Sequence, residues 1–195
     1  MLSLVLRRVH MYAGLFLTPW ILMYTASTFV MNHRTLFRGH EPAPPKWEIE
    51  REMVYPGEFP PDAKAPQMAL QLLAAVDVDG AHQANLRDGK LTVNRLDPVN
   101  PRRITFNPSD KKVTVEKQVF ESAVFLERMH RRRGYQHNYI LEDLWAVSVD
   151  VTIAGIVVWA LSGLWLWWEM KVTRKAGALA LLAGIGLFAL FLAVL

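Results

Sequence analysis

Histidines stand beside the apolar stretches of this chain, and their side chains are the ones most able to do chemistry. His10 and His33 bracket one apolar stretch, and His130 and His137 precede another in the segment LERMHRRRGYQHNY. Imidazole is the side chain most often used to ligate metals and haem iron. The chain contains no cysteine, so thiolate ligands, disulfides and cysteine nucleophiles are excluded.

The apolar stretches must position these histidines. Three long stretches of the chain contain no Asp, Glu, Lys or Arg: residues 11–31, 151–168 and 176–195. Each approaches the length of about 20 residues that a helix needs to cross a bilayer. With 52% hydrophobic residues and a mean hydropathy of +0.13, the composition suits a small membrane protein with one polar domain. We predict transmembrane helices at residues 1–33, 144–170 and 176–195, in a lipid bilayer.

The polar part lies between the first two predicted spans. A helix is expected to begin near Pro66, and its apolar residues recur at helical spacing. Two β-hairpins are expected to follow, one turning at Asp88-Gly89 and the other around residues 107–110. Residues 62–119 are therefore predicted to form a small α+β domain outside the membrane.

Two further segments flank this domain. Residues 34–61 are rich in proline and acidic residues, which is typical of an extended connector. Residues 120–143 are expected to form an amphipathic juxtamembrane segment. The predicted fold class is thus a membrane α-helical protein with three transmembrane helices and a small α+β domain between helices 1 and 2.

Charge asymmetry gives an expected orientation. The short connector after the second span carries Lys171, Arg174 and Lys175, and Arg7 and Arg8 precede the first span. Positive charges in short loops favour the cytoplasmic side. We therefore expect a cytoplasmic N-terminus and an α+β domain on the outer side.

The spacing of the histidines limits how they can act together. His10 and His33 are 23 positions apart, or roughly 35 Å along a helix, so they cannot ligate one iron. On the outer side, His33 could pair with His130 or with His137 to hold a haem, and His33 with His130 is the candidate metal pair. On the inner side, the partner of His10 would be Met170 or the His10 of a second copy.

Each histidine also has a simpler interpretation. His10 could be an interfacial polar residue or a helix-packing donor, and His33 could be an ordinary solvated helix end. His130 lies among arginines, where a positive surface could attract lipid phosphates or haem propionates.

The segment RRVHMYAGLFLTPWILMYTAS resembles the first helix of the PepSY-associated transmembrane (PepSY-TM) family, which begins with histidine-x-x-x-glycine. LWAVSVDVTIAGIVVWALSGLWLWW resembles a later helix of that family, and ITFNPSDKKVTV resembles the last strands of a PepSY domain. The resemblance implies a bacterial inner-membrane protein with a periplasmic PepSY-like domain. Larger members include ferric-siderophore reductases that hold b-type haem between histidines of neighbouring helices, so haem b is the implied cofactor.

The residues and the resemblance leave three functions open. The first is electron transfer through haem b, at most as a component of a ferric-reductase-like system. The second is a non-catalytic accessory subunit of a larger membrane complex, and the third is a PepSY-type regulator of a peptidase. A stripe of small residues at 177–186 is typical of close helix contact and favours a membrane-protein partner or a homo-oligomer. No phosphate-binding loop or zinc-protease motif occurs, and we expect no nucleic-acid partner.

Overall fold

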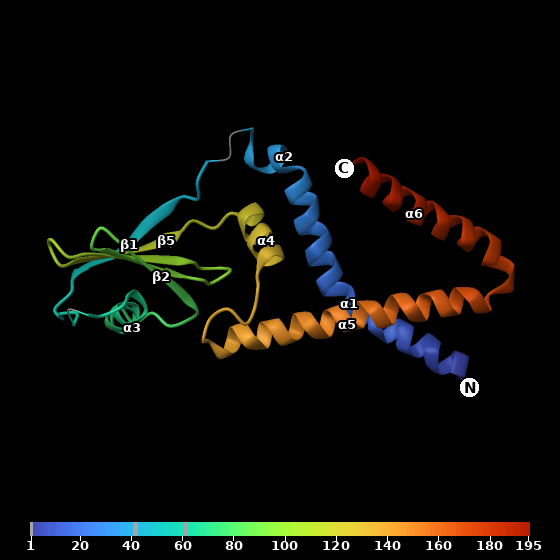
Figure 1. Ribbon diagram of the computed structural model, residues 1–195, viewed down its shortest axis with the longest axis horizontal. Helices are drawn as coiled ribbons and strands as arrows, with labels where there is room; N and C mark the ends of the chain where they lie inside the picture. The colour runs from blue at the N-terminus through green and yellow to red at the C-terminus, as the bar shows by residue number, and fades with distance from the viewer. Residues whose placement is uncertain (1, 41–42, 61) are drawn as a thin grey trace. The chain divides into compact units, whose positions relative to one another are not determined.

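The computed structural model describes residues 2–40, 43–60 and 62–195 (Figure 1). It divides into two compact units. One consists of residues up to Ile21 together with Ser148–Leu195, and the other is Leu22–Val147. Two long helices, α1 (Leu2–Asn32) and α5 (Ile140–Glu169), contribute residues to both units, and each unit is described by itself.

The unit Leu22–Val147 contains a five-stranded antiparallel sheet in the order β1-β5-β4-β3-β2. The strands are β1 (Trp47–Val54), β2 (His82–Arg87), β3 (Lys90–Arg95), β4 (Arg102–Asn107) and β5 (Lys112–Gln118). Both predicted hairpins are confirmed. The first turns at Asp88 and Gly89, whose φ angles of 51° and 76° match the left-handed conformation that a two-residue hairpin requires.

One face of the sheet is covered by helix α3 (Ala65–Ala75), as Figure 1 shows. Alternate strand residues point toward this helix because side chains of a strand alternate between faces. The core is formed by the buried residues Tyr55, Ala69, Leu72, Leu73, Val76, Leu91, Val93, Ile104, Phe106, Val113 and Val115. The helix has proline in its first turn, as the sequence predicted from Pro66. The α+β domain is therefore held by a single apolar layer between α3 and the sheet.

Strand β1 differs from the expectation that residues 34–61 form an extended connector. It lies at the edge of the sheet and pairs with β5 from Trp47 to Val54. Its side chains are mostly exposed, and its acidic residues form ion pairs with basic residues of the sheet: Glu52 with Lys112 of the adjacent β5, and Glu50 with Arg102 of β4, the next strand but one. An edge strand is stabilised by backbone bonds and cross-strand ion pairs, so it lacks the apolar alternation that marks a buried strand.

Two shorter helices complete this unit. Helix α2 (Arg34–Arg38) follows α1, and helix α4 (Ser122–Arg131) follows the sheet. Helix α4 lies within the segment expected to be amphipathic, and basic residues occupy its last turn. The α2 residue Arg38 forms an ion pair with Glu127 of α4 at 3.6 Å.

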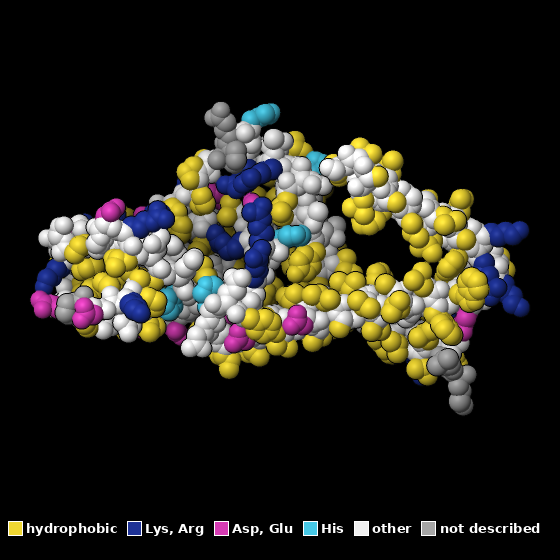
Figure 2. Space-filling model, in the orientation of Figure 1, with side chains coloured by type: hydrophobic (Ala, Val, Ile, Leu, Met, Phe, Trp, Pro, Cys, Tyr) yellow, Lys and Arg dark blue, Asp and Glu magenta, His cyan; other side chains and the backbone are white. Residues whose placement is uncertain are grey.

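The other unit is helical. Helix α5 is followed by the short 3₁₀ turn η1 (Lys171–Thr173) and by α6 (Arg174–Val194). Small residues allow close packing of α1 on α5: a methyl group added at Gly155 would lie 3.2 Å from Leu17. Among the described residues, three helices are long and apolar enough to cross a membrane: Ser3–Asn32, Ile140–Glu169 and Lys171–Val194. Hydrophobic side chains cover the surface of α5 and α6 (Figure 2).

Candidate functional site

His10 of α1 lies against α5. Its Nδ1 is 2.9 Å from Oγ of Ser162 and 3.1 Å from the carbonyl oxygen of Trp159, and its ring stacks on the Trp159 indole with centroids 5.6 Å apart. The Ser162 hydroxyl donates its own proton to the Trp159 carbonyl at 2.9 Å. Because a hydroxyl has a single proton, Ser162 must accept from His10, and the proton of the imidazole is on Nδ1.

His130 of α4 is held in the same way by α1. Its Nδ1 is 2.8 Å from Oγ of Ser27, and its ring meets Tyr24 edge-on with centroids 5.4 Å apart. Ser27 is 0% exposed and donates its proton to the Tyr24 carbonyl at 2.8 Å. The Nδ1–H of His130 is therefore the donor to Ser27.

The two contacts share one arrangement, which we call the serine seats: Tyr24 with Ser27 for His130, and Trp159 with Ser162 for His10. In each seat the aromatic residue precedes the serine by three positions on a helix, so both lie on one helical face. In each, the protonated Nδ1 leaves Nε2 with a free lone pair. This is the tautomer in which histidine ligates a metal through Nε2 while Nδ1–H donates to a second group.

The other two candidate histidines have different partners. His33 donates from Nδ1 to the carbonyl of Phe29 at 3.2 Å and stacks on the Phe29 ring, so its contacts are within one helical turn. His137 donates from Nδ1 to Glu142 at 2.7 Å, and the Glu142 side chain is 4% exposed. Both rings are therefore also protonated on Nδ1.

The structure does not fix His33 and His130 at the same hydrogen-bond acceptor. His33 follows Ser27 by six positions, which corresponds to about 9 Å along a helix and about 120° around it. The His130 ring is fixed at Ser27, whereas the His33 ring is fixed at Phe29. Across residues 2–40, 43–60 and 62–195, no cluster of three or more His, Asp or Glu side chains is arranged to hold a metal ion.

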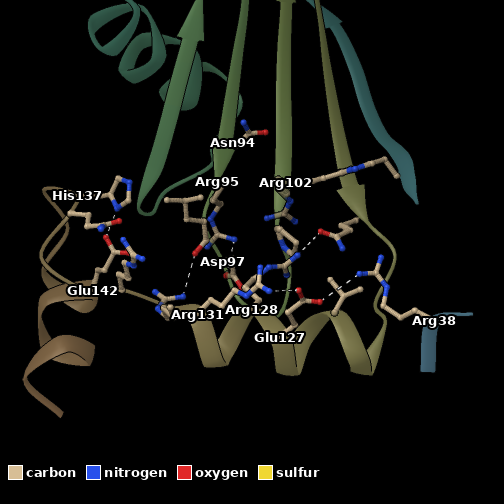
Figure 3. A pocket seen from close by; sticks show the side chains of 18 residues that line it. Arg38, Asn94, Arg95, Asp97, Arg102, Glu127, Arg128, Arg131, His137 and Glu142 are labelled. Atoms are coloured by element: carbon tan, nitrogen blue, oxygen red, sulfur yellow. Dashed lines mark hydrogen bonds and ion pairs between the residues drawn. The ribbon is translucent and has the colours of Figure 1, made fainter. Parts of the chain in front are cut away.

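A cavity of about 550 Å³ lies beside α4 within the unit Leu22–Val147 (Figure 3). Its ionisable lining residues are Arg38, Arg95, Asp97, Arg102, Glu127, Arg128, Arg131, Arg132, Arg133, His137 and Glu142. Figure 2 shows Lys and Arg side chains gathered over the place where Figure 1 draws α4. Arginines outnumber carboxylates, so the cavity is positively charged.

The carboxylates of the cavity already have basic partners. Glu127 forms ion pairs with Arg38 at 3.6 Å and with Arg131 at 3.1 Å. Asp97 pairs with Arg95 at 3.0 Å. Burial alone would raise the pKa of Asp97, but backbone N–H groups and the Arg95 guanidinium outweigh it and hold the pKa below its ordinary value. Each of these two carboxylates is therefore already engaged by arginine.

Arg128 and Arg132 donate to neutral oxygens instead. Arg128 donates to the Pro98 carbonyl at 3.0 Å and to Oε1 of Gln118 at 2.6 Å. Burial lowers the pKa of Arg128, with Asp97 acting in the opposite direction. Arg132 donates to the Leu96 carbonyl at 3.4 Å, and within the described part of the chain no hydrogen-bond partner reaches its buried Nε.

Sequence reasoning identified the histidines but missed Ser27, Ser162 and the cavity. The serines could have been found, because Tyr-Thr-Ala-Ser and Trp-Ala-Leu-Ser repeat one spacing inside two apolar helices. Of the cavity, only the positive surface beside His130 was expected from the sequence. Its other arginines come from α2, two strands and the rest of α4, which the sequence alone does not bring together. No protein-family model, curated protein or solved structure matches the chain.

Proposed function

We propose that this chain is a PepSY-TM protein of a bacterial inner membrane that binds b-type haem and takes part in electron transfer across the membrane. The observation that carries the proposal is the pair of serine seats. Each fixes a histidine, His130 or His10, in the tautomer that leaves Nε2 available as an axial ligand. Haem, when bound, would supply one-electron chemistry between ferrous and ferric iron.

The residues of the chain would orient and tune the ligands. Ser27 and Ser162 accept the Nδ1–H bonds, which fixes the rotation of each imidazole and increases its basicity as a ligand. On this side the candidate axial pair is His33 with His130 or His33 with His137, and all three rings have Nδ1 protonated. For His10 the candidate is the same residue of a second copy.

The proposed orientation places the N-terminus in the cytoplasm and the α+β domain in the periplasm. Its support is the basic connector between α5 and α6, which carries Lys171, Arg174 and Lys175. Protease added to intact spheroplasts should cleave the α+β domain. Cleavage only after lysis would contradict this orientation.

The haem proposal is tested by comparing two histidine variants. His130→Ala should remove or shift the b-type α-band in the reduced-minus-oxidised spectrum of the purified protein. His82→Ala is the matched control, because His82 begins strand β2, bonds through Nδ1 to the Gly80 carbonyl, and should leave the spectrum unchanged. An α-band that is unaffected by His130→Ala would exclude His130 as a ligand.

A second candidate function is a non-catalytic accessory subunit of a larger membrane complex. It is favoured by the fact that both serine seats join two helices, so they can act purely in packing. Helix α6 also has no buried residue, which leaves its apolar surface available to lipid or to a partner. Co-purification with a larger assembly at fixed stoichiometry, together with a featureless optical spectrum, would support this function.

A further inference from the structure

The arginine-lined cavity has more positive charge than its own carboxylates can balance. Glu127 is shared by Arg38 and Arg131, and Asp97 is paired with Arg95. A buried cation without a carboxylate partner is costly unless an anion from outside supplies the missing interaction. The cavity is therefore suited to an anionic ligand.

The free hydrogen-bonding capacity lies on α4 and the residue that follows it. Arg128 and Arg132 donate to the carbonyls of Pro98 and Leu96, in the loop that follows β3. Figure 3 shows Arg95 and Arg102 at the ends of β3 and β4 on the same side of the cavity. A guanidinium has five N–H donors in a planar fork that matches phosphate oxygens. Several guanidinium groups around one hollow therefore favour a phosphate group over a single carboxylate.

The position of the cavity identifies the source of that phosphate. Its lining includes Arg38, six positions after the end of α1 at Asn32, and His137, three positions before the start of α5 at Ile140. Both helices are long and apolar enough to span a bilayer. Residues so close to the ends of two spans lie at the level of lipid headgroups.

We propose that this cavity binds the phosphodiester headgroup of an anionic phospholipid. Its volume of about 550 Å³ falls in the range of small-molecule sites, about 300–1,000 Å³, and exceeds the needs of one inorganic phosphate. The proposal rests on membrane insertion of α1 and α5 and does not require haem. A cavity that bound no lipid would leave the optical spectrum of the protein unchanged. The lipid proposal and the haem proposal are therefore tested separately.

The test uses full-length protein purified in detergent, stripped of lipid, and titrated with phosphatidylglycerol or phosphatidylcholine. Bound lipid is counted by native mass spectrometry, and inorganic phosphate is added as a competitor. We expect phosphatidylglycerol to bind at least about tenfold more tightly, with affinity that falls as salt increases. Equal affinity for the two lipids would overturn the proposal, as would complete displacement of phosphatidylglycerol by equimolar phosphate.

Two double variants separate the site from general charge. Arg131→Gln with Arg133→Gln changes exposed residues at the rim and should weaken phosphatidylglycerol binding about tenfold without disturbing the core. Arg87→Gln with Lys90→Gln removes the same charge from the exposed hairpin at the other end of the sheet and should change affinity less than twofold. Equal losses in the two double variants would overturn the proposal.

Discussion

Nδ1 of His130 donates a hydrogen bond to Oγ of Ser27 across 2.8 Å, and the serine has already given its own proton to the Tyr24 carbonyl. The direction of this bond fixes where the imidazole proton is, and so which nitrogen can act as a ligand. The same relationship holds between His10 and Ser162. Helices α1 and α5 therefore each fix one histidine, His130 and His10 respectively, in the tautomer that is protonated on Nδ1.

Ser27→Ala removes the acceptor of the His130 proton. Groups of this kind contribute about 10- to 100-fold to metal affinity, so the proposed haem function predicts lower haem occupancy and a changed reduction potential in this variant. Haem content per protein and a potentiometric titration would measure both. Ser27→Thr keeps the hydroxyl and should restore most of the occupancy. Loss of haem in Ser27→Thr equal to that in Ser27→Ala would contradict the role of the hydroxyl.

Gly163→Val should destabilise the packing of α1 on α5. A methyl group added at Gly163 lies 3.1 Å from Cε1 of His10, so a larger side chain must displace the ring. We expect a loss of about 1–3 kcal/mol, measured by unfolding of the purified protein in detergent. Gly184→Val is the matched control, since an added methyl there meets nothing within 4 Å. Equal losses at the two glycines would show that helix propensity, not the His10 contact, is responsible.

Gly89→Ala should weaken the β2–β3 hairpin through backbone strain alone. Gly89 has φ of 76°, and the nearest atom to an added methyl is Cγ of Pro108 at 3.6 Å, an ordinary contact. We expect a cost of about 1–2 kcal/mol, measured as faster hydrogen–deuterium exchange in β2 and β3. Asp88→Asn should have little effect, because asparagine also tolerates the left-handed conformation. Unchanged exchange in Gly89→Ala would contradict the observed turn.

Asp97 should make the α+β domain sensitive to acid. Its carboxylate accepts from the backbone N–H groups of Val99 and Asn100 at 2.8 Å each, and its pKa is lowered in the folded protein. A group with a lowered folded pKa contributes its full stability above the unfolded value, about 3.9, and loses it as pH falls through the folded value. The free energy of unfolding of the α+β domain should therefore decrease as the pH falls below about 4.

Asp97→Asn tests this pH dependence. The variant should lose about 1 kcal/mol at neutral pH, and its stability should change less between pH 5 and pH 3 than that of the wild type. Hydrogen–deuterium exchange of β3 and β4 in the full-length protein would report both effects. A pH profile identical to that of the wild type would show that Asp97 does not contribute.

Much of the fold was accessible from the sequence because strong local signals coincide with the elements. Asp88-Gly89 marks a hairpin by its conformational freedom, and Pro66 marks the first turn of α3. The apolar helices were recognised from length and lack of charge, although α5 begins at Ile140, four residues before the predicted boundary. Strand β1 was missed because its stability comes from pairing with β5, which is distant in the sequence.

The candidate site was only partly accessible. Histidine could be selected by its chemistry, but its tautomer depends on a serine from another helix: Ser27 for His130 and Ser162 for His10. Pairing of His33 with His130 was inferred from their common location near helix ends. The structure gives each ring its own hydrogen-bond acceptor, Ser27 for His130 and the Phe29 carbonyl for His33, and their pairing as haem ligands stays a prediction.

The most direct measurement is the haem content of full-length protein purified from haem-sufficient cells, by pyridine haemochrome assay and by reduced-minus-oxidised spectroscopy. The proposed function requires a b-type α-band and at least one haem for every two chains. Colourless protein that remains folded in detergent and binds no haem on titration would contradict it.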